Sequence, residues 1–156
     1  MDDILGKVVA MLLAAAIFVG IPVCYMGQRA KSAEQLYLLS VNTEFVDSVC
    51  NVGFVDFTMY QQFLKEVALA REVYDVRLQH EQKELLLNGT EYSYVSTFYD
   101  EEDVLEQLNK GEKYYLSQGD YLRVQIVKDA DSYLAGMLSD STSNVFYGGT
   151  VRYEAY

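Results

Sequence analysis

The chain has 156 residues, of which 51% are hydrophobic and 22% are charged, and this is the composition of a folded protein and not of a disordered one. Outside its first 26 residues it carries 21 Asp and Glu against 11 Lys and Arg, a net charge of −10. An acidic surface without a basic cluster repels phosphate backbones, so we expect no nucleic-acid partner.

An uncharged segment runs from Val8 to Met26, close to the roughly 20 residues that are needed to cross about 30 Å of hydrocarbon. Its apolar residues would face all sides of a helix, which disfavours a core helix of a soluble domain. A secretory signal peptide is the alternative, but such a peptide has a basic start and small residues at its far end. Here the chain starts Met-Asp-Asp, and its alanine run at 14–16 is central. We therefore predict an uncleaved transmembrane anchor over residues 1–26, which places the protein in the cell membrane.

Small side chains within the anchor would let neighbouring helices approach closely in lipid. The candidate helix-assembly positions are Ala14, Ala15, Ala16 and Gly20, together with Pro22, which removes a backbone donor and should kink the helix. Membrane lipid is the first partner that this segment implies. Charge leaves its orientation open, because Lys7 precedes the segment while Arg29 and Lys31 follow it, a distribution that leans toward a cytoplasmic carboxyl end.

The apolar residues between Gly27 and Asn51 recur at intervals of three and four, which is the period of an amphipathic helix. The predicted packing stripe consists of Leu36, Leu39, Phe45, Val46 and Val49. We therefore expect the anchor to continue as a stalk helix over residues 27–53, with Gly53 at its end. One helix would then span lipid with its first half and pack a domain with its second half.

Two shorter helices are predicted after the stalk. Thr58 and the glutamine three residues later fit a capping box, so a second helix should start there and end near Arg71. Asp100 can cap a third helix over residues 101–109, and Gly111 can terminate it.

Alternating apolar residues and turn signals predict a mostly antiparallel sheet in the rest of the head. The expected strand residues are Tyr74 to Gln79, Leu85 to Leu87, Tyr92 to Tyr94, Tyr114 to Leu116, Tyr121 to Lys128 with Leu122, Val124 and Ile126 facing inward, and Val151 to Ala155. Asn88-Gly89 is the turn signal of a hairpin, and Gly148-Gly149 precedes the closing or edge strand. Asp131 is expected to cap a short helix through Leu138. This order of elements makes residues 54–156 an α+β head.

No sequence motif points to catalysis, a metal or a cofactor, so we expect a protein that is not an enzyme and that needs no cofactor. His80 is the only histidine, and we expect it to be structural, either at the surface or hydrogen-bonded. Cys50 lies beside the packing stripe as a buried, inert thiol, too far along a helix from Cys24 for a disulfide. The acidic run 100–103 lacks the ligand spacing of a calcium loop, so it reads as a solvated first helical turn.

Several short motifs resemble a known family. The stretch from Phe45 to Val49 followed by Gly53, and the turn Gly119-Asp120-Tyr121, are similar to segments of minor pilins and pseudopilins of Tad/Flp-type pilus systems in Gram-positive bacteria. The resemblance implies a pilin-like fold, in which a long N-terminal transmembrane-plus-stalk helix packs on a small, mostly antiparallel sheet. It also implies a cytoplasmic N-terminus, an extracytoplasmic head, and other pilin-like subunits and the pilus assembly machinery as partners.

The chain departs from the family at one position. Pilins usually carry a glutamate at the fifth mature position, whereas no glutamate occurs here before Glu34. A minor, tip or assembly-platform subunit therefore fits better than a subunit of the main shaft. The alternative function is a bitopic membrane sensor or regulator whose acidic head binds a ligand or a partner protein. A membrane-anchored enzyme is a third hypothesis, with no motif in its favour.

Overall fold

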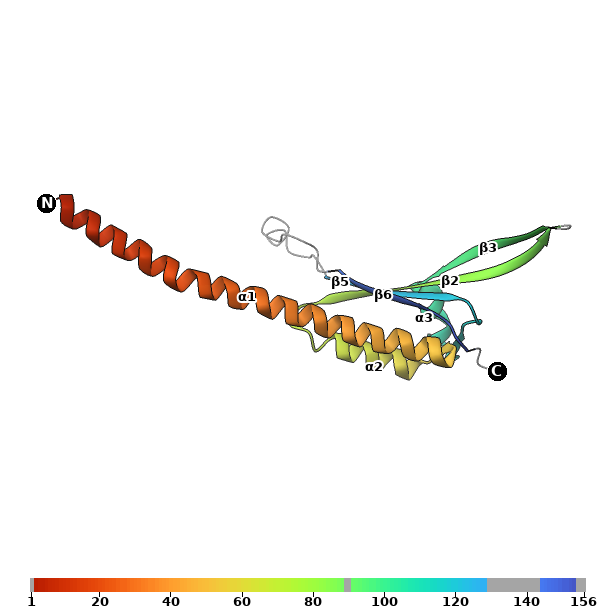
Figure 1. Ribbon diagram of the computed structural model, residues 1–156. Coiled ribbons are helices and arrows are strands. Elements are labelled where there is room, and N and C mark those ends of the chain that lie inside the picture. Colours follow the sequence, from red (N-terminus) through yellow and green to blue (C-terminus); the bar gives the residue numbers. More distant parts are fainter. Residues whose placement is uncertain (1, 89–90, 129–143, 154–156) are drawn as a thin grey trace. The chain divides into compact units, whose positions relative to one another are not determined.

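The computed structural model describes residues 2–88, 91–128 and 144–153, with only the backbone described at 2–5, 85–88 and 91–94. The chain divides into two compact units, residues 1–36 and 37–156. The first helix, α1 (Asp2–Val52), runs through both units without interruption, and Pro22 lies inside it (Figure 1). The predicted continuation of the anchor as a stalk helix that ends at Gly53 is therefore confirmed.

The end of α1 is set by a glycine. Gly53 adopts a left-handed conformation with φ of 75°, and its amide donates a hydrogen bond of 2.8 Å to the Val49 carbonyl. Such a residue commonly terminates a helix, because only glycine enters this region without steric cost.

A second helix, α2 (Phe57–Val67), packs beside the end of α1. The ring of Phe63 stacks on that of Phe45 with centroids 4.3 Å apart. The predicted capping box at Thr58 is wrong, because Asp56 is the N-cap and the helix starts one residue later. The helix also ends before Arg71, since the backbone turns away after Val67 toward the first long strand.

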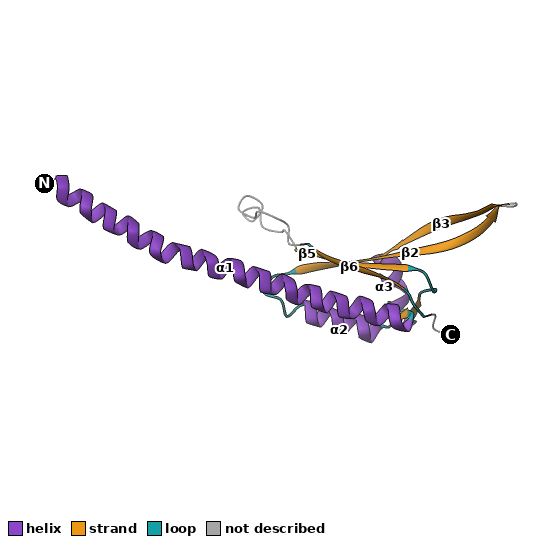
Figure 2. Cartoon of the chain, viewed as in Figure 1, coloured by secondary structure: helices purple, strands orange, loops and turns teal. Residues whose placement is uncertain are grey.

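Four strands form an antiparallel sheet in the order β3-β2-β5-β6 (Figure 2). Their bounds are β2 Tyr74–Asn88, β3 Glu91–Asp100, β5 Tyr121–Lys128 and β6 Val145–Thr150. The predicted hairpin is confirmed by the pairing of β2 with β3 up to Asn88 and Glu91, while Gly89 in its turn lies outside the described residues. The inward face of β5 is also confirmed, since Leu122, Val124 and Ile126 are buried.

The closing strand occurs earlier than the sequence indicates. β6 includes Gly148 and Gly149, and the chain leaves the sheet before the buried Val151. A Cβ atom on Gly149 would lie 3.1 Å from the Cys50 sulfur, so the glycine lets the strand approach α1 closely. The strand that was predicted to continue to Tyr153 therefore ends at Thr150. The helix expected at 131–138 lies outside the described residues, and so does Ala155.

A smaller sheet pairs β1 (Phe54–Val55) with β4 (Tyr114–Tyr115). Before β4, the helix α3 (Glu101–Asn109) starts as predicted at Asp100, whose amide donates a hydrogen bond of 3.1 Å to the Asp103 carboxylate. Gly111, with φ of 79°, follows its end. The acidic run thus forms the first helical turn, where negative charge is favourable.

The architecture confirms the α+β class: a long N-terminal helix is combined with small antiparallel sheets. Apolar residues of α1, α2, α3 and the strands form one core in the second unit, with members such as Leu38, Val46, Val55, Phe63, Leu78, Leu108 and Val124. The second half of α1 is therefore a core element of the head.

Candidate functional site

The first candidate site is the apolar part of α1. Among the described residues, one helix is long enough and apolar enough to cross a membrane, and it lies near the N-terminus. None of its most apolar segment is buried. The predicted assembly positions Ala14, Ala15, Ala16, Gly20 and Pro22 all lie within it and are exposed. Each is therefore accessible to lipid or to another helix.

The stalk residues divide between the core and the surface. Phe45, Val46 and Val49 are buried, whereas Leu36 and Leu39 are 67% and 39% exposed. The buried row instead begins at Leu38, because the helix turns by about 100° per residue and Leu36 points about 160° away from it. The packing stripe thus starts at Leu38 and excludes the two leucines that sequence spacing had included.

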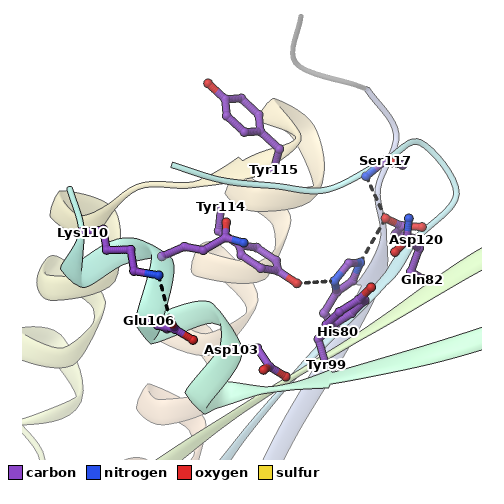
Figure 3. Close-up of a pocket in the computed structure, with 11 residues that line it drawn as sticks. His80, Gln82, Tyr99, Asp103, Glu106, Lys110, Tyr114, Tyr115, Ser117 and Asp120 are labelled. Carbon is purple, nitrogen blue, oxygen red and sulfur yellow. Dashed lines mark hydrogen bonds and ion pairs between the residues drawn. The ribbon is translucent and has the colours of Figure 1, made fainter. Parts of the chain in front are cut away.

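The second candidate site is a cleft of about 490 Å³ on the head (Figure 3). Its lining residues are His80, Gln82, Tyr99, Asp103, Glu106, Gln107, Lys110, Tyr114, Tyr115, Ser117 and Asp120. They come from β2, β3, α3, β4 and the turn before β5. At one side of the cleft the Lys110 ammonium pairs with the Glu106 carboxylate at 2.7 Å.

His80 and Asp120 form the buried base of the cleft. Both residues are almost completely buried, and the Nε2 atom of His80 lies 3.0 Å from the Oδ2 atom of Asp120. The Nδ1 atom lies 2.8 Å from the Tyr114 hydroxyl, as Figure 3 shows. The imidazole also stacks on the Tyr99 ring, with centroids 5.4 Å apart. Of the two placements that the sequence left open for His80, the hydrogen-bonded one is confirmed and the surface one is wrong.

The hydrogen-bond donors around Asp120 indicate its charge state and the tautomer of His80. Its carboxylate accepts bonds from the backbone amides of Ser117, at 2.7 Å, and Lys83, at 3.4 Å. An ionised carboxylate only accepts, so His80 carries a proton on Nε2 and donates it to Asp120. At Nδ1 a neutral imidazole accepts the Tyr114 hydroxyl proton, whereas an imidazolium donates to the Tyr114 oxygen.

The hydrogen bonds among Asp120, His80 and Tyr114 join separate elements of the head. Burial is the main cause that raises the pKa of Tyr114, so its phenol stays protonated and remains a donor. The hydrogen bonds between Asp120 and His80 and between His80 and Tyr114 connect β2, β4 and the turn at 117–120. Among the described residues, no group of three or more His, Cys, Asp or Glu could hold a metal ion.

Alkaline pH should weaken this fold, because burial raises the pKa of both Tyr60 and Tyr114. The folded state holds these protons more tightly than the unfolded state. The protonated phenols therefore contribute their full stabilisation of the folded state below about pH 10. As pH rises further, the free energy of unfolding falls by up to about 1.4 kcal/mol per pH unit for each tyrosine. Denaturant unfolding between pH 8 and 12 should show a shallower decline for Tyr60→Phe and Tyr114→Phe than for the wild type. Equal slopes in all three proteins would contradict the assignment.

The sequence analysis did not predict this cleft. His80 is 34 residues from Tyr114 and 40 residues from Asp120, so no local motif connects them. The available signal was the Gly-Asp-Tyr turn, in which a carboxylate follows a glycine with φ of 95° at Gly119.

Comparison of the chain with models of known protein families, with curated proteins and with solved structures found no match in any of the three.

Proposed function

We propose that this protein is a membrane-anchored, pilin-like subunit, a minor pilin or pseudopilin, in the assembly of a Tad/Flp-type pilus or a related secretion filament. One observation carries the proposal. α1 is a single helix whose exposed apolar part is long enough to span a bilayer and whose second part, from Leu38, belongs to the core of an α+β head. This combination is what the family resemblance implies.

In this function the anchor does two tasks. It holds the subunit in lipid, and its small residues at 14–16 and Gly20 let it pack against the helices of neighbouring subunits. Close contact of this kind lets van der Waals forces act where the hydrophobic effect between helices is absent. The N-terminus is cytoplasmic and the head is extracytoplasmic, and the subunit has no catalytic role.

Removing the anchor should separate the head from its partners. Deletion of residues 4–26 should move the protein from the membrane fraction to the soluble fraction and abolish its co-purification with filament subunits. Fractionation and pull-down from cells that carry the whole pilus system would measure both effects. The expected loss is complete, because the deletion removes the apolar segment that both lipid and neighbouring helices would contact.

A matched control separates anchoring from assembly. Replacing Ala14, Ala15, Ala16 and Gly20 by leucine keeps the segment apolar but fills its close-approach face. This variant should stay in the membrane and lose co-purification. Co-purification of the deletion variant with the complete complex would show that the helix is not what assembles the subunit.

A further inference from the structure

The four-stranded sheet ends in two edges that no other described strand covers. They are the outer sides of β3 and β6, because the strand order is β3-β2-β5-β6. β3 is ten residues long, pairs with β2 without a bulge, and contains no proline, lysine or arginine. Short length, bulges, prolines and lysines are features by which proteins stop an edge strand from pairing with another chain. The β3 edge lacks these features and can accept a further strand.

Each edge presents an exposed phenylalanine on the same face of the sheet. Phe98 on β3 is 60% exposed and Phe146 on β6 is 68% exposed. Phe98 pairs with Glu81 of β2. Phe146 pairs with Gln125 of β5, which pairs in turn with Arg77 of β2. Positions 77 and 81 are an even number of residues apart, so both rings lie on one face, where they would meet if two sheets stood edge to edge.

The two halves of the sheet carry opposite charge. β2 and β3 together contain five Asp and Glu against two Lys and Arg, a net charge of −3. β5, β6 and residues 151–153 contain three Lys and Arg and no carboxylate side chain, a net charge of +3. Contact between the β3 side of one copy and the β6 side of another is therefore electrostatically favourable. Contact between two β3 edges would oppose like charges.

The topology lets the two unlike edges pair without a rotation of either copy. Neighbouring strands of the sheet are antiparallel throughout, so in a sheet of four strands the two edge strands run in opposite directions. A second copy that is displaced sideways therefore brings its β6 antiparallel to β3 of the first copy. Displacement also leaves the anchors of the two copies pointing in the same direction, as two chains in one membrane require.

We propose that β3 of one copy of this chain pairs antiparallel with β6 of the next copy in the same membrane. The pairing adds a backbone hydrogen-bond ladder and buries the exposed phenylalanine of each edge against the other. Because the two paired surfaces differ, the contact can repeat from copy to copy instead of closing on a symmetric pair. The inference deepens the proposed filament function and rests on it, since that function places co-oriented subunits side by side.

The register follows from the lengths of the two edges. Setting Phe98 opposite Phe146 of the next copy pairs all six residues of β6 with residues 94–99 of β3, a segment without charged side chains. Within one sheet Phe98 is level with Thr150, through Glu81 and Tyr121. This register therefore shifts the next copy by four residues, or roughly 13 Å, along the strands.

Disulfide cross-linking between copies tests the pairing and its register. The full chain carries Cys24→Ala, because Cys24 is exposed, and it keeps the buried Cys50. Phe98→Cys and Phe146→Cys are introduced together, the protein is reconstituted in phosphatidylcholine vesicles, and copper phenanthroline with oxygen oxidises the thiols. Dimers, trimers and higher oligomers should appear on non-reducing gels, because directly opposed positions of antiparallel strands lie within disulfide range. Absence of these products would overturn the proposal.

Single variants and a face control make the result specific. A mixture of Phe98→Cys and Phe146→Cys chains should give dimers and nothing larger, and neither variant alone should cross-link. In the matched control Thr97→Cys with Phe146→Cys, the two thiols lie on opposite faces of the sheet, so cross-linking should fall at least fivefold. Cross-linking of Phe98→Cys alone would indicate pairing of two β3 edges, and equal yields in the control would indicate random collision. Either result would refute the proposal.

Failure of the edge pairing and failure of the proposed function give different results. If the wild-type chain co-purified with filament subunits while the double-cysteine variant gave no oligomers, the edge pairing would be wrong and the filament function would stand. If the variant cross-linked as expected while the wild-type chain failed to co-purify with filament subunits, the filament function would be wrong and the pairing would remain as self-association in the membrane.

Discussion

Replacing Asp120 by alanine is expected to lower the free energy of unfolding of the head by about 3–5 kcal/mol, because each buried donor that it leaves unpaired costs about 1–3 kcal/mol. The substitution removes the acceptor of two backbone amides and of the His80 Nε2 proton. All three donors would be left in a region where Asp120 and His80 are almost completely buried, so water cannot replace the carboxylate at low cost. Guanidinium unfolding of the full chain in micelles, followed by the near-ultraviolet circular dichroism of its tyrosines, measures this loss.

Two further variants make the result specific. Glu102→Ala removes an exposed carboxylate from α3 and should change the stability by less than about 0.5 kcal/mol. Asp120→Asn keeps the shape and one acceptor, so it should fall between the wild type and the alanine variant. If the Asp120→Ala and Glu102→Ala variants were equally stable, the buried hydrogen-bond network would not stabilise the folded state.

Truncating Phe45 to alanine should cost about 3–5 kcal/mol, because the change opens a cavity in the core. The Phe45 ring is buried, stacks on Phe63 at 4.3 Å and lies 6.4 Å from the Tyr60 ring. The measurement is the same denaturant titration. It tests directly that the second part of α1 is a core element of the head.

The same helix supplies the control for this prediction. Leu39→Ala removes a comparable apolar side chain from a position that is 39% exposed, and it should cost less than about 1 kcal/mol. The ratio of the two losses distinguishes the core row through Leu38 from the row that sequence spacing suggested. Similar losses at Phe45 and Leu39 would contradict the burial pattern.

Local sequence signals predicted the elements whose boundaries depend on neighbouring residues. α3 follows from Asp100 and Gly111, and the hairpin follows from two alternating segments around a turn signal. The inward face of β5 follows from the two-residue period of a strand. These features form over a few residues, so a reading of the chain in short windows recovers them.

Tertiary contacts decide the features that the sequence placed incorrectly. The α2 start moved from Thr58 to the cap at Asp56, and the closing strand includes Gly148-Gly149 because its glycines permit close packing on α1. Leu36 and Leu38 differ only in the direction they face around the helix, which apolar spacing alone specifies weakly. The cleft depends on the convergence of β2, β4 and the turn before β5, which no local period encodes.

The close approach of β6 to α1 has a consequence for the order of folding during synthesis. The Arg152 amide donates a hydrogen bond of 2.9 Å to the Cys50 carbonyl, and Val151 exchanges hydrogen bonds with the turn at 117–120. The ribosome completes the stalk long before it completes these partners. Contacts of such long sequence separation therefore make closure of the head a slow, late step of folding.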